Sequence, residues 1–333
     1  MSKPVILTGD RTTGPLHLGH YAGSLKNRLR YQETHEQFIL LADSQALTDN
    51  IGQIGKVKDS VLEVAMDYLA VGIDPQKTTI CLQSHLPALA ELSMLYLNFV
   101  SVGRLQRNPT VKEEIRARGF DKSIPAGFLC YPAAQAADIT GFKATVVPVG
   151  EDQVPMIEQT NEIIRKVNSI ADRDLLKEVE AIVPKAGRLP GVDGVSKMSK
   201  SAGNSVNLSA NPAEISSAVK AMYTDPNHLR VDDPGQVEGN VVFTYLDAFH
   251  DDVEEVEDLK CQYRRGGLGD VKLKSLLDLT LQNLLEPIRE RRSEFEQRPD
   301  DVRDMVREGT RKALNRTEQT KSELFEGLGF FRL

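Results

Sequence analysis

Two histidines lie in the first segment of the chain whose residue types and spacing suit chemistry. His17 and His20 flank Gly19 in a loop that follows an apolar run at 5–8 and precedes apolar residues at helical spacing. Backbone N–H groups and the helix dipole make the start of a helix an anion site, and imidazoles three residues apart can donate to the same phosphate. The loop therefore predicts a phosphate-binding site. The alternative interpretation is that both histidines cap the helix or lie on the surface.

A second such segment is Lys197-Met198-Ser199-Lys200-Ser201, which follows the glycine-containing stretch 191–194. Its two lysines and two hydroxyls lie on a loop that glycine makes flexible. Ammonium groups that stabilise the negative charge developing on a leaving pyrophosphate act only in the transition state and therefore raise the rate. We expect Lys197 and Lys200 to act in catalysis rather than in tight ground-state binding. A solvated charge run is the alternative.

Strands that alternate with helices must position these two loops. Continuous apolar runs predict strands at 5–8, 38–42, 79–82 and 144–149, with amphipathic helices between them. This alternation predicts an α/β fold with a Rossmann-like, doubly wound parallel sheet. Ligands of such sheets bind at the carboxyl ends of the strands, which is where both loops are expected.

The chain is predicted to divide into two domains. Residues 1–201 form the Rossmann-like catalytic domain, and a helical insertion at about 86–141 is longer than a crossover requires, so we expect it to form a dimer interface. Residues 202–333 form a C-terminal all-α domain, whose last helix is expected to pack back on the catalytic domain.

Composition narrows the class of protein. Of 333 residues, 40% are hydrophobic and 27% are charged, and no run reaches the roughly 18 apolar residues of a membrane span. Three scattered cysteines without a CxxC pair, and a start without signal-peptide features, predict a soluble, cytoplasmic protein with no metal site of its own. The net charge of −7 argues against a protein that coats nucleic acid through bulk charge.

Together, His17-Leu18-Gly19-His20 and the 197–201 segment, on a parallel sheet with a helical tail, resemble the class I aminoacyl-tRNA synthetases. The resemblance extends to tryptophanyl-tRNA synthetases over nearly the whole chain through the stretches 68–75, 83–84, 131–132, 136–139 and 147–153. Departures from the common bacterial pattern, such as Arg11 in place of a glutamine and Gln135 in place of a methionine, favour a divergent second bacterial type.

The resemblance implies an activity and its partners. The expected reaction converts L-tryptophan and ATP to tryptophanyl-adenylate and pyrophosphate, with Mg²⁺ on the ATP phosphates, and then transfers tryptophan to the 3′ end of tRNA(Trp). A homodimer is implied, in which the helical domain reads the anticodon. The expected catalytic residues are His17, His20, Lys197, Lys200 and Lys112, although Lys112 also suits a solvated helix. The expected ATP-binding residues are Arg11, Thr12, Thr13, Gly19, His20, Gly150, Glu151, Asp152, Leu189, Lys197, Met198, Ser199, Lys200 and Ser201.

The resemblance also places a tryptophan pocket. Its expected residues are Asp138, Tyr131, Gln135, Leu7, Gln45 and Gln153. Asp138 can accept a hydrogen bond from an indole N–H or a phenol O–H and does not decide between them. Tyrosyl enzymes, by resemblance, hold the phenol with a tyrosine where Leu7 stands, so the apolar residue favours tryptophan. A tyrosyl-tRNA synthetase, a nucleotidylyltransferase and a noncatalytic tryptophan-binding paralogue remain as alternatives.

Overall fold

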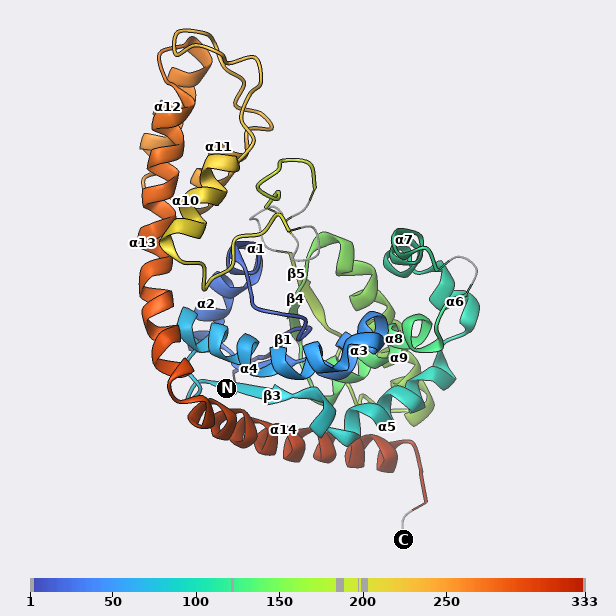
Figure 1. Cartoon of the computed structure of the whole chain (residues 1–333). Coiled ribbons are helices and arrows are strands. Elements are labelled where there is room, and N and C mark those ends of the chain that lie inside the picture. The colour runs from blue at the N-terminus through green and yellow to red at the C-terminus, as the bar shows by residue number, and fades with distance from the viewer. Residues whose placement is uncertain (1–2, 121–122, 184–188, 197, 199–202, 332–333) are drawn as a thin grey trace.

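The protein is described by a computed structural model that covers residues 3–120, 123–183, 189–196, 198 and 203–331. Its centre is a parallel sheet of five strands in the order β3-β2-β1-β4-β5 (Figure 1). The strands are β1 (Val5–Asp10), β2 (Glu36–Leu41), β3 (Thr78–Leu82), β4 (Val146–Pro148) and β5 (Glu180–Ile182). The predicted α/β class and parallel sheet are confirmed. The sequence analysis did not predict β5, which is only three residues long and begins with a glutamate.

Helices cover both faces of the sheet and form the whole C-terminal part. They are α1 (Leu18–His20), α2 (Lys26–Thr34), α3 (Asp43–Asn50), α4 (Ile54–Val71), α5 (Pro87–Tyr96), α6 (Val102–Arg107), α7 (Pro109–Arg118), α8 (Ala126–Gly141), α9 (Val154–Ala171), α10 (Pro212–Ala221), α11 (Val241–Phe249), α12 (Val253–Arg265), α13 (Asp270–Glu296) and α14 (Pro299–Gly327). A π-helical stretch at Tyr21–Leu25 joins α1 to α2, so the chain stays helical from Leu18 to Thr34.

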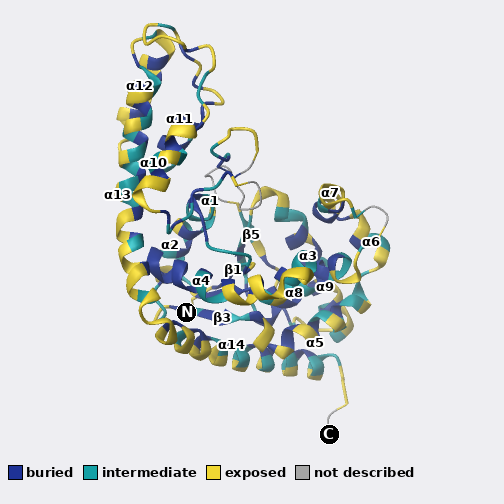
Figure 2. Ribbon diagram, in the orientation of Figure 1, coloured by how far each residue is buried: buried dark blue, intermediate teal, exposed yellow. Residues whose placement is uncertain are grey.

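Alternate residues of the central strands pack into two separate hydrophobic cores. Ile39 and Leu41 belong to a core that continues through α4 into α13, whereas Phe38 and Leu40 belong to a core formed with α5, α8 and α9. This alternation follows from the two-residue period of a strand. Figure 2 shows the buried strands at the centre and the exposed outer faces of α13 and α14.

The last two helices wrap the sheet from outside. Helix α13 runs down one side of the molecule, and α14 lies along β3 (Figure 1). A Cβ at Gly309 would collide with the carbonyl oxygen of Ile80, so glycine permits this close approach of α14 to the strand. The hydroxyl of Thr310 accepts a hydrogen bond from the N–H of Leu82 at 3.0 Å. Helix α14 therefore covers the edge of the sheet that β3 would otherwise leave open.

Within the described residues, none of the helices is both long enough and apolar enough to span a membrane.

Candidate active site

The carboxyl ends of the parallel strands bring four segments to one edge of the sheet. These segments lie at 10–20 after β1, 42–45 after β2, 83–85 after β3 and 149–153 after β4. The chain runs from β1 outward to β2 and β3, and then returns to the other side of β1 for β4. This reversal between β1 and β4 is the point at which open α/β sheets bind ligands.

The two histidines form a reciprocal cap at the start of α1. His17 Nδ1 accepts a hydrogen bond from Gly19 N at 3.1 Å, and His17 N donates to His20 Nδ1 at 3.2 Å. The ring centroids lie 3.9 Å apart. Because both Nδ1 atoms accept, the neutral rings carry their proton on Nε2, which is a suitable donor to a phosphate oxygen. The histidines therefore cap the helix, as the alternative interpretation held, and this cap leaves Nε2 as the proton-bearing atom.

The two sequence motifs meet although about 180 residues separate them. Met198 Sδ accepts a hydrogen bond from Gly19 N at 3.2 Å, and Met198 N donates to Leu189 O at 3.2 Å. A Cβ at Gly19 would lie 2.9 Å from the His17 ring and 3.3 Å from Met198 Sδ, so the contact needs a glycine. Lys197, Ser199, Lys200 and Ser201, which the sequence analysis also assigned to this site, lie outside the described residues.

The segment after the second motif pairs with the histidine loop. Leu18 N donates to Val206 O at 2.9 Å, and Leu208 N donates to Leu16 O at 2.9 Å. An antiparallel bridge joins His17 to Asn207 between these bonds. The sequence analysis missed this pairing because no strand pattern is present in either segment.

A buried carboxylate connects the same loop to the C-terminal part. Asp67 of α4 is fully buried, and its Oδ2 accepts a hydrogen bond from Leu16 N at 2.6 Å. Its Oδ1 forms an ion pair with Arg292 of α13, which also pairs with Glu63 and Glu296. Helix α13 thus helps to hold the loop in place, which the sequence analysis did not anticipate.

Asp10, at the end of β1, belongs to a second buried ionic group. Its Oδ2 accepts hydrogen bonds from Arg28 Nη1 at 2.8 Å and from the Tyr68 hydroxyl at 2.7 Å. Burial acts to raise the pKa of Asp10, but the positive charge of Arg28, helped by His20 and Tyr68, outweighs it and lowers the pKa to about 2. Asp10 is therefore ionised at neutral pH and joins the end of β1 to α2 and α4.

The other residues expected to bind ATP differ in exposure. Arg11 is exposed, and its Nη1 bonds both oxygens of Asp49 at 3.1 and 3.0 Å. Asp49 also pairs with Arg118 of α7 at 2.5 Å, so one carboxylate links the loop after β1 to the insertion. Thr12 is fully buried, whereas Thr13 is partly exposed.

The segment after β4 is tied to helix α7. Gly150 and Glu151 are exposed, and a Cβ at Gly150 would lie 2.7 Å from Asp152 Oδ1, which explains the glycine. The Thr110 hydroxyl of α7 donates to Asp152 O at 2.5 Å. Lys112 is exposed on α7, whose buried face carries Val111 and Ile115.

Helix α8 carries three of the six expected tryptophan-binding residues. Tyr131 and Asp138 are buried and Gln135 is partly buried. Leu7 of β1 lies in the same core as the alanines of α8. The Tyr131 hydroxyl donates to Glu114 Oε2 at 3.2 Å, and burial, followed by the Glu114 charge, raises the pKa of Tyr131 well above its usual value.

Gln83 joins two of the expected tryptophan-binding residues. Its Nε2 donates to Asp138 Oδ1 at 3.0 Å and Oδ2 at 2.9 Å, and its Oε1 accepts from Gln45 N at 2.9 Å. Burial raises the pKa of Asp138 to about 7, although the hydrogen bond from Gln83 opposes this rise. The sequence analysis did not assign Gln83 to the site, but its position directly after β3 was the signal that could have identified it. Gln153, by contrast, bonds its neighbour Asp152 at 3.3 Å.

Comparison with known proteins identifies the family. The model for class I tRNA synthetases (W and Y) matches residues 1–286. The tryptophan–tRNA ligase of Clostridium longisporum is 56% identical, and the match covers 99% of this chain and 98% of that protein. This chain belongs to the class I tryptophan–tRNA ligases.

Other tryptophan–tRNA ligases agree with this assignment. The enzyme of Lactococcus lactis is 54% identical over 99% of this chain and 98% of its own length. The crystal structure of tryptophanyl-tRNA synthetase from Campylobacter jejuni, complexed with ADP and tryptophan, is 29% identical with a TM-score of 0.84 and covers 98% of this chain and 100% of that one. The prediction of an aminoacyl-tRNA synthetase for tryptophan is confirmed, over the tyrosyl and nucleotidylyltransferase alternatives.

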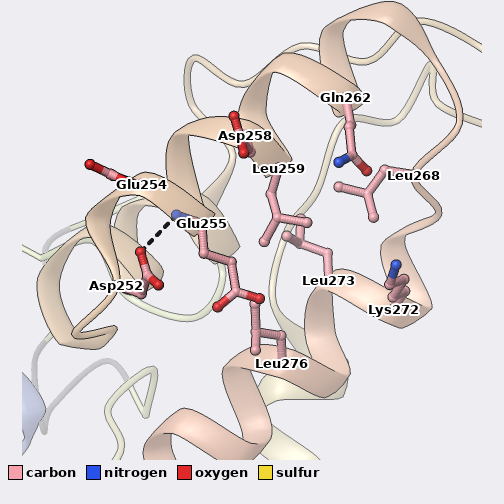
Figure 3. Close-up of a pocket in the computed structure, with 10 residues that line it drawn as sticks. All are labelled: Asp252, Glu254, Glu255, Asp258, Leu259, Gln262, Leu268, Lys272, Leu273 and Leu276. Atoms are coloured by element: carbon pink, nitrogen blue, oxygen red, sulfur yellow. Dashed lines mark hydrogen bonds between the residues drawn. The ribbon is translucent and has the colours of Figure 1, made fainter.

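A separate pocket of this tryptophan–tRNA ligase lies far from the strand ends. It has a volume of about 570 Å³ between α12 and α13. Figure 3 shows the acidic side chains Asp252, Glu255 and Asp258 around Leu259 and Leu273. Because none of the described motif residues lines it, we do not take this pocket as the candidate active site.

Proposed function

We propose that this chain activates tryptophan at the carboxyl edge of its sheet, with ATP on the histidine loop and tryptophan beside α8. The tryptophan carboxylate attacks the α-phosphorus of ATP in line, the bond to the β-phosphate oxygen breaks, and pyrophosphate leaves. Little proton transfer is needed, so positioning and charge stabilisation supply the rate. The single observation that carries the proposal is the contact of Met198 with Gly19, because it brings the two sequence motifs together.

On the phosphate side, the Nε2–H groups of His17 and His20 donate to phosphate oxygens, and Lys197 and Lys200 stabilise the departing pyrophosphate. Lys112 reaches the triphosphate from α7. Within the described part of the chain, no three His, Cys, Asp or Glu side chains are grouped to hold a metal ion. The proposal places Mg²⁺ on the phosphate oxygens of ATP, where it would neutralise charge, as is usual for this cation.

On the tryptophan side, Asp138 accepts the hydrogen bond of the indole N–H, and Leu7 packs against the ring. Tyr131 and Gln135 lie four residues apart on α8 and therefore share a face of that helix, where they bind the α-ammonium group. Gln45 and Gln153 complete this subsite, each at the end of a strand.

The proposed function extends to tRNA(Trp) and a second subunit. After activation, the terminal ribose hydroxyl of tRNA attacks the adenylate and displaces AMP. Residues 1–201 form the catalytic domain and 202–333 the anticodon-binding domain. The helices at 86–141 provide the homodimer interface, so that the helical domain of one subunit presents tRNA to the other.

The test is exchange of labelled pyrophosphate into ATP by the purified chain, run with tryptophan, with tyrosine and without an amino acid. Exchange with tryptophan alone is the expected result. Exchange with tyrosine would make Leu7 a misleading residue, and no exchange at all would favour a specialised paralogue. A second assay, charging of tRNA(Trp), then tests the transfer step, and sedimentation tests the dimer.

A further inference from the structure

The side-chain amide of Gln83 donates hydrogen bonds to Asp138 and accepts one from the backbone N–H of Gln45. The side chain is 8% exposed and makes all three of its hydrogen bonds inside the protein. Its Oε1 must face the N–H of Gln45 and its NH₂ must face the carboxylate, so the amide has one permitted orientation. The segments 43–45 and 83–84 are further joined because Asp43 Oδ1 accepts from Ser84 N at 2.9 Å.

This arrangement distinguishes an indole from a phenol. An indole N–H is only a donor and needs one acceptor, which an ionised Asp138 provides. A phenol oxygen is both donor and acceptor, and it needs a donor as well. Leu7 offers none, and the amide of Gln83 already donates to Asp138. A phenol in this subsite would therefore be left incompletely paired, which is a large source of selectivity in buried sites.

We propose that Gln83 is a positioning residue that sets the preference for indole over phenol by holding Asp138 ionised and oriented as an acceptor. The inference rests on the function proposed above, in which Asp138 receives the indole N–H. If Gln83 lost its amide, Asp138 would gain a proton near neutral pH and become a donor. That form keeps a neutral carbonyl acceptor but loses the charge that strengthens the bond from the indole N–H, and its O–H can donate to a phenol oxygen.

The ionisation of Asp138 depends on its hydrogen bond from Gln83. Among the described residues, Gln83 supplies the interaction that lowers the pKa of Asp138 against the effect of burial. The Cys81 thiol on β3 is close enough to feel the Asp138 charge, but burial first and this charge second raise its pKa so far that it stays neutral.

Charged groups on the helices that pack against α8 bond elsewhere. They include Asp43 and Asp49 on α3, Glu91 on α5, Arg104 on α6, Glu162 on α9 and Glu323 on α14. Asp43 accepts from Ser84 N, and Asp49 pairs with Arg11. The partners of the others are each other or lysines: Arg104 with Glu162, Glu91 with Lys321, and Glu323 with Lys143.

The experiment compares Gln83→Met with the natural chain and with Gln37→Met. Gln37 is a matched control, because it is a buried glutamine of the same sheet whose amide bonds Arg28 O and Thr78 Oγ1 at the opposite end of the strands. The ligands are L-tryptophan and L-3-benzothienylalanine, in which sulfur replaces the indole N–H. The chain contains no tryptophan, so the fluorescence of bound tryptophan reports its affinity directly, and the analogue is measured by competition.

The natural chain and Gln37→Met are expected to prefer tryptophan to the sulfur analogue at pH 8, and to lose this preference as the pH falls through about 7. In Gln83→Met the preference should fall about tenfold, the loss should begin at a higher pH, and selection of tryptophan over tyrosine in pyrophosphate exchange should also fall about tenfold. An unchanged preference and pH profile in Gln83→Met would overturn the inference.

Two further outcomes are informative. If the natural chain itself fails to distinguish tryptophan from the sulfur analogue, the role of Asp138 in the proposed function is wrong, and the inference is overturned with it. If Gln83→Met does not fold, Gln83→Glu keeps the side-chain shape and places a second carboxyl against Asp138. It should likewise move the loss of tryptophan binding to a higher pH, and a profile that stays in place contradicts the proposal.

Discussion

Two buried carboxylates at the same edge of the sheet have opposite properties. Asp10, on the phosphate side, accepts bonds from Arg28 and Tyr68, and its pKa is about 2. Asp138, on the tryptophan side, accepts a bond only from the neutral amide of Gln83 among the interactions described, and its pKa is about 7. Asp138 is buried and the Asp10 side chain is only 15% exposed, so their partners rather than their burial make most of the difference.

The contrast separates a carboxylate that serves the fold from one that serves a ligand. The charge of Asp10 is neutralised within the protein by a guanidinium. Among the residues that the structure describes, no cation pairs with Asp138, and a donor on a bound ligand would complete its hydrogen bonding. Strongly perturbed carboxyl groups of this kind gather at functional sites. In the proposed function, the phosphate side is therefore electrostatically complete without a ligand, while the tryptophan side would be completed by its substrate.

The largest expected effect comes from making Asp10 resemble Asp138. Arg28→Met would leave Asp10 buried without its cation, which typically destabilises a protein by about 3–5 kcal/mol. Urea unfolding at pH 7 measures the loss. The loss of stability should be smaller at pH 4. At that pH the unpaired Asp10 of Arg28→Met takes up a proton, whereas Asp10 of the natural chain, with a pKa of about 2, stays ionised. Arg30→Met on the exposed side of the same helix is the control, and an equal loss at both pH values would contradict the comparison.

The next largest effect tests catalysis on the phosphate side. Lys197→Ala should lower the rate of tryptophan activation about 10²–10³-fold, or about 3–4 kcal/mol, because its ammonium acts on charge that develops in the transition state. Tryptophan affinity should change little. Single-turnover pyrophosphate release measures the rate, with Lys58→Ala on the exposed side of α4 as control. Full activity in Lys197→Ala would remove this loop from the mechanism.

A smaller effect is expected on the tryptophan side. Asp138→Asn replaces an ionised acceptor by an amide and should weaken tryptophan binding by about 1.5–3 kcal/mol. Ligand fluorescence measures the affinity, and Asp172→Asn at the end of α9 makes the same chemical change at an exposed position. Equal affinity in Asp138→Asn would mean that the indole N–H finds another acceptor.

The smallest effect concerns stability and has the opposite sign to the loss from Arg28→Met. The folded pKa of Asp138 lies above the ordinary Asp value of 3.8, so the folded state binds the proton more tightly, and its stability falls as the pH rises from about 4 to about 7. Asp138→Asn lacks this penalty and should be more stable than the natural chain by about 2 kcal/mol at pH 8, with little gain at pH 4. Thermal unfolding at the two pH values measures it, and a destabilised variant at pH 8 would show that the Asp138 charge supports the fold.

The difference between the two sides also appears in what could be predicted. The phosphate side is built from contiguous motifs, and the spacing of His17 and His20 indicated an anion site without any structure. The tryptophan side draws single residues from β1, from α3, from the segment that follows β3 and from α8. Of these, Gln83 was missed, because one glutamine in a sequence has no recognisable spacing.

The sequence by itself determined the parallel sheet, the two motifs and the family. Apolar runs and short motifs are local, and their periodicity and spacing survive without tertiary context. Only the tertiary structure decided that Arg28 neutralises Asp10, that Arg292 reaches Asp67, and that Gln83 orients Asp138. Those partners are separated by 18, 225 and 55 positions in the chain. Whether a buried carboxylate is charged depends on which distant group the fold places beside it, and no local sequence pattern predicts that group.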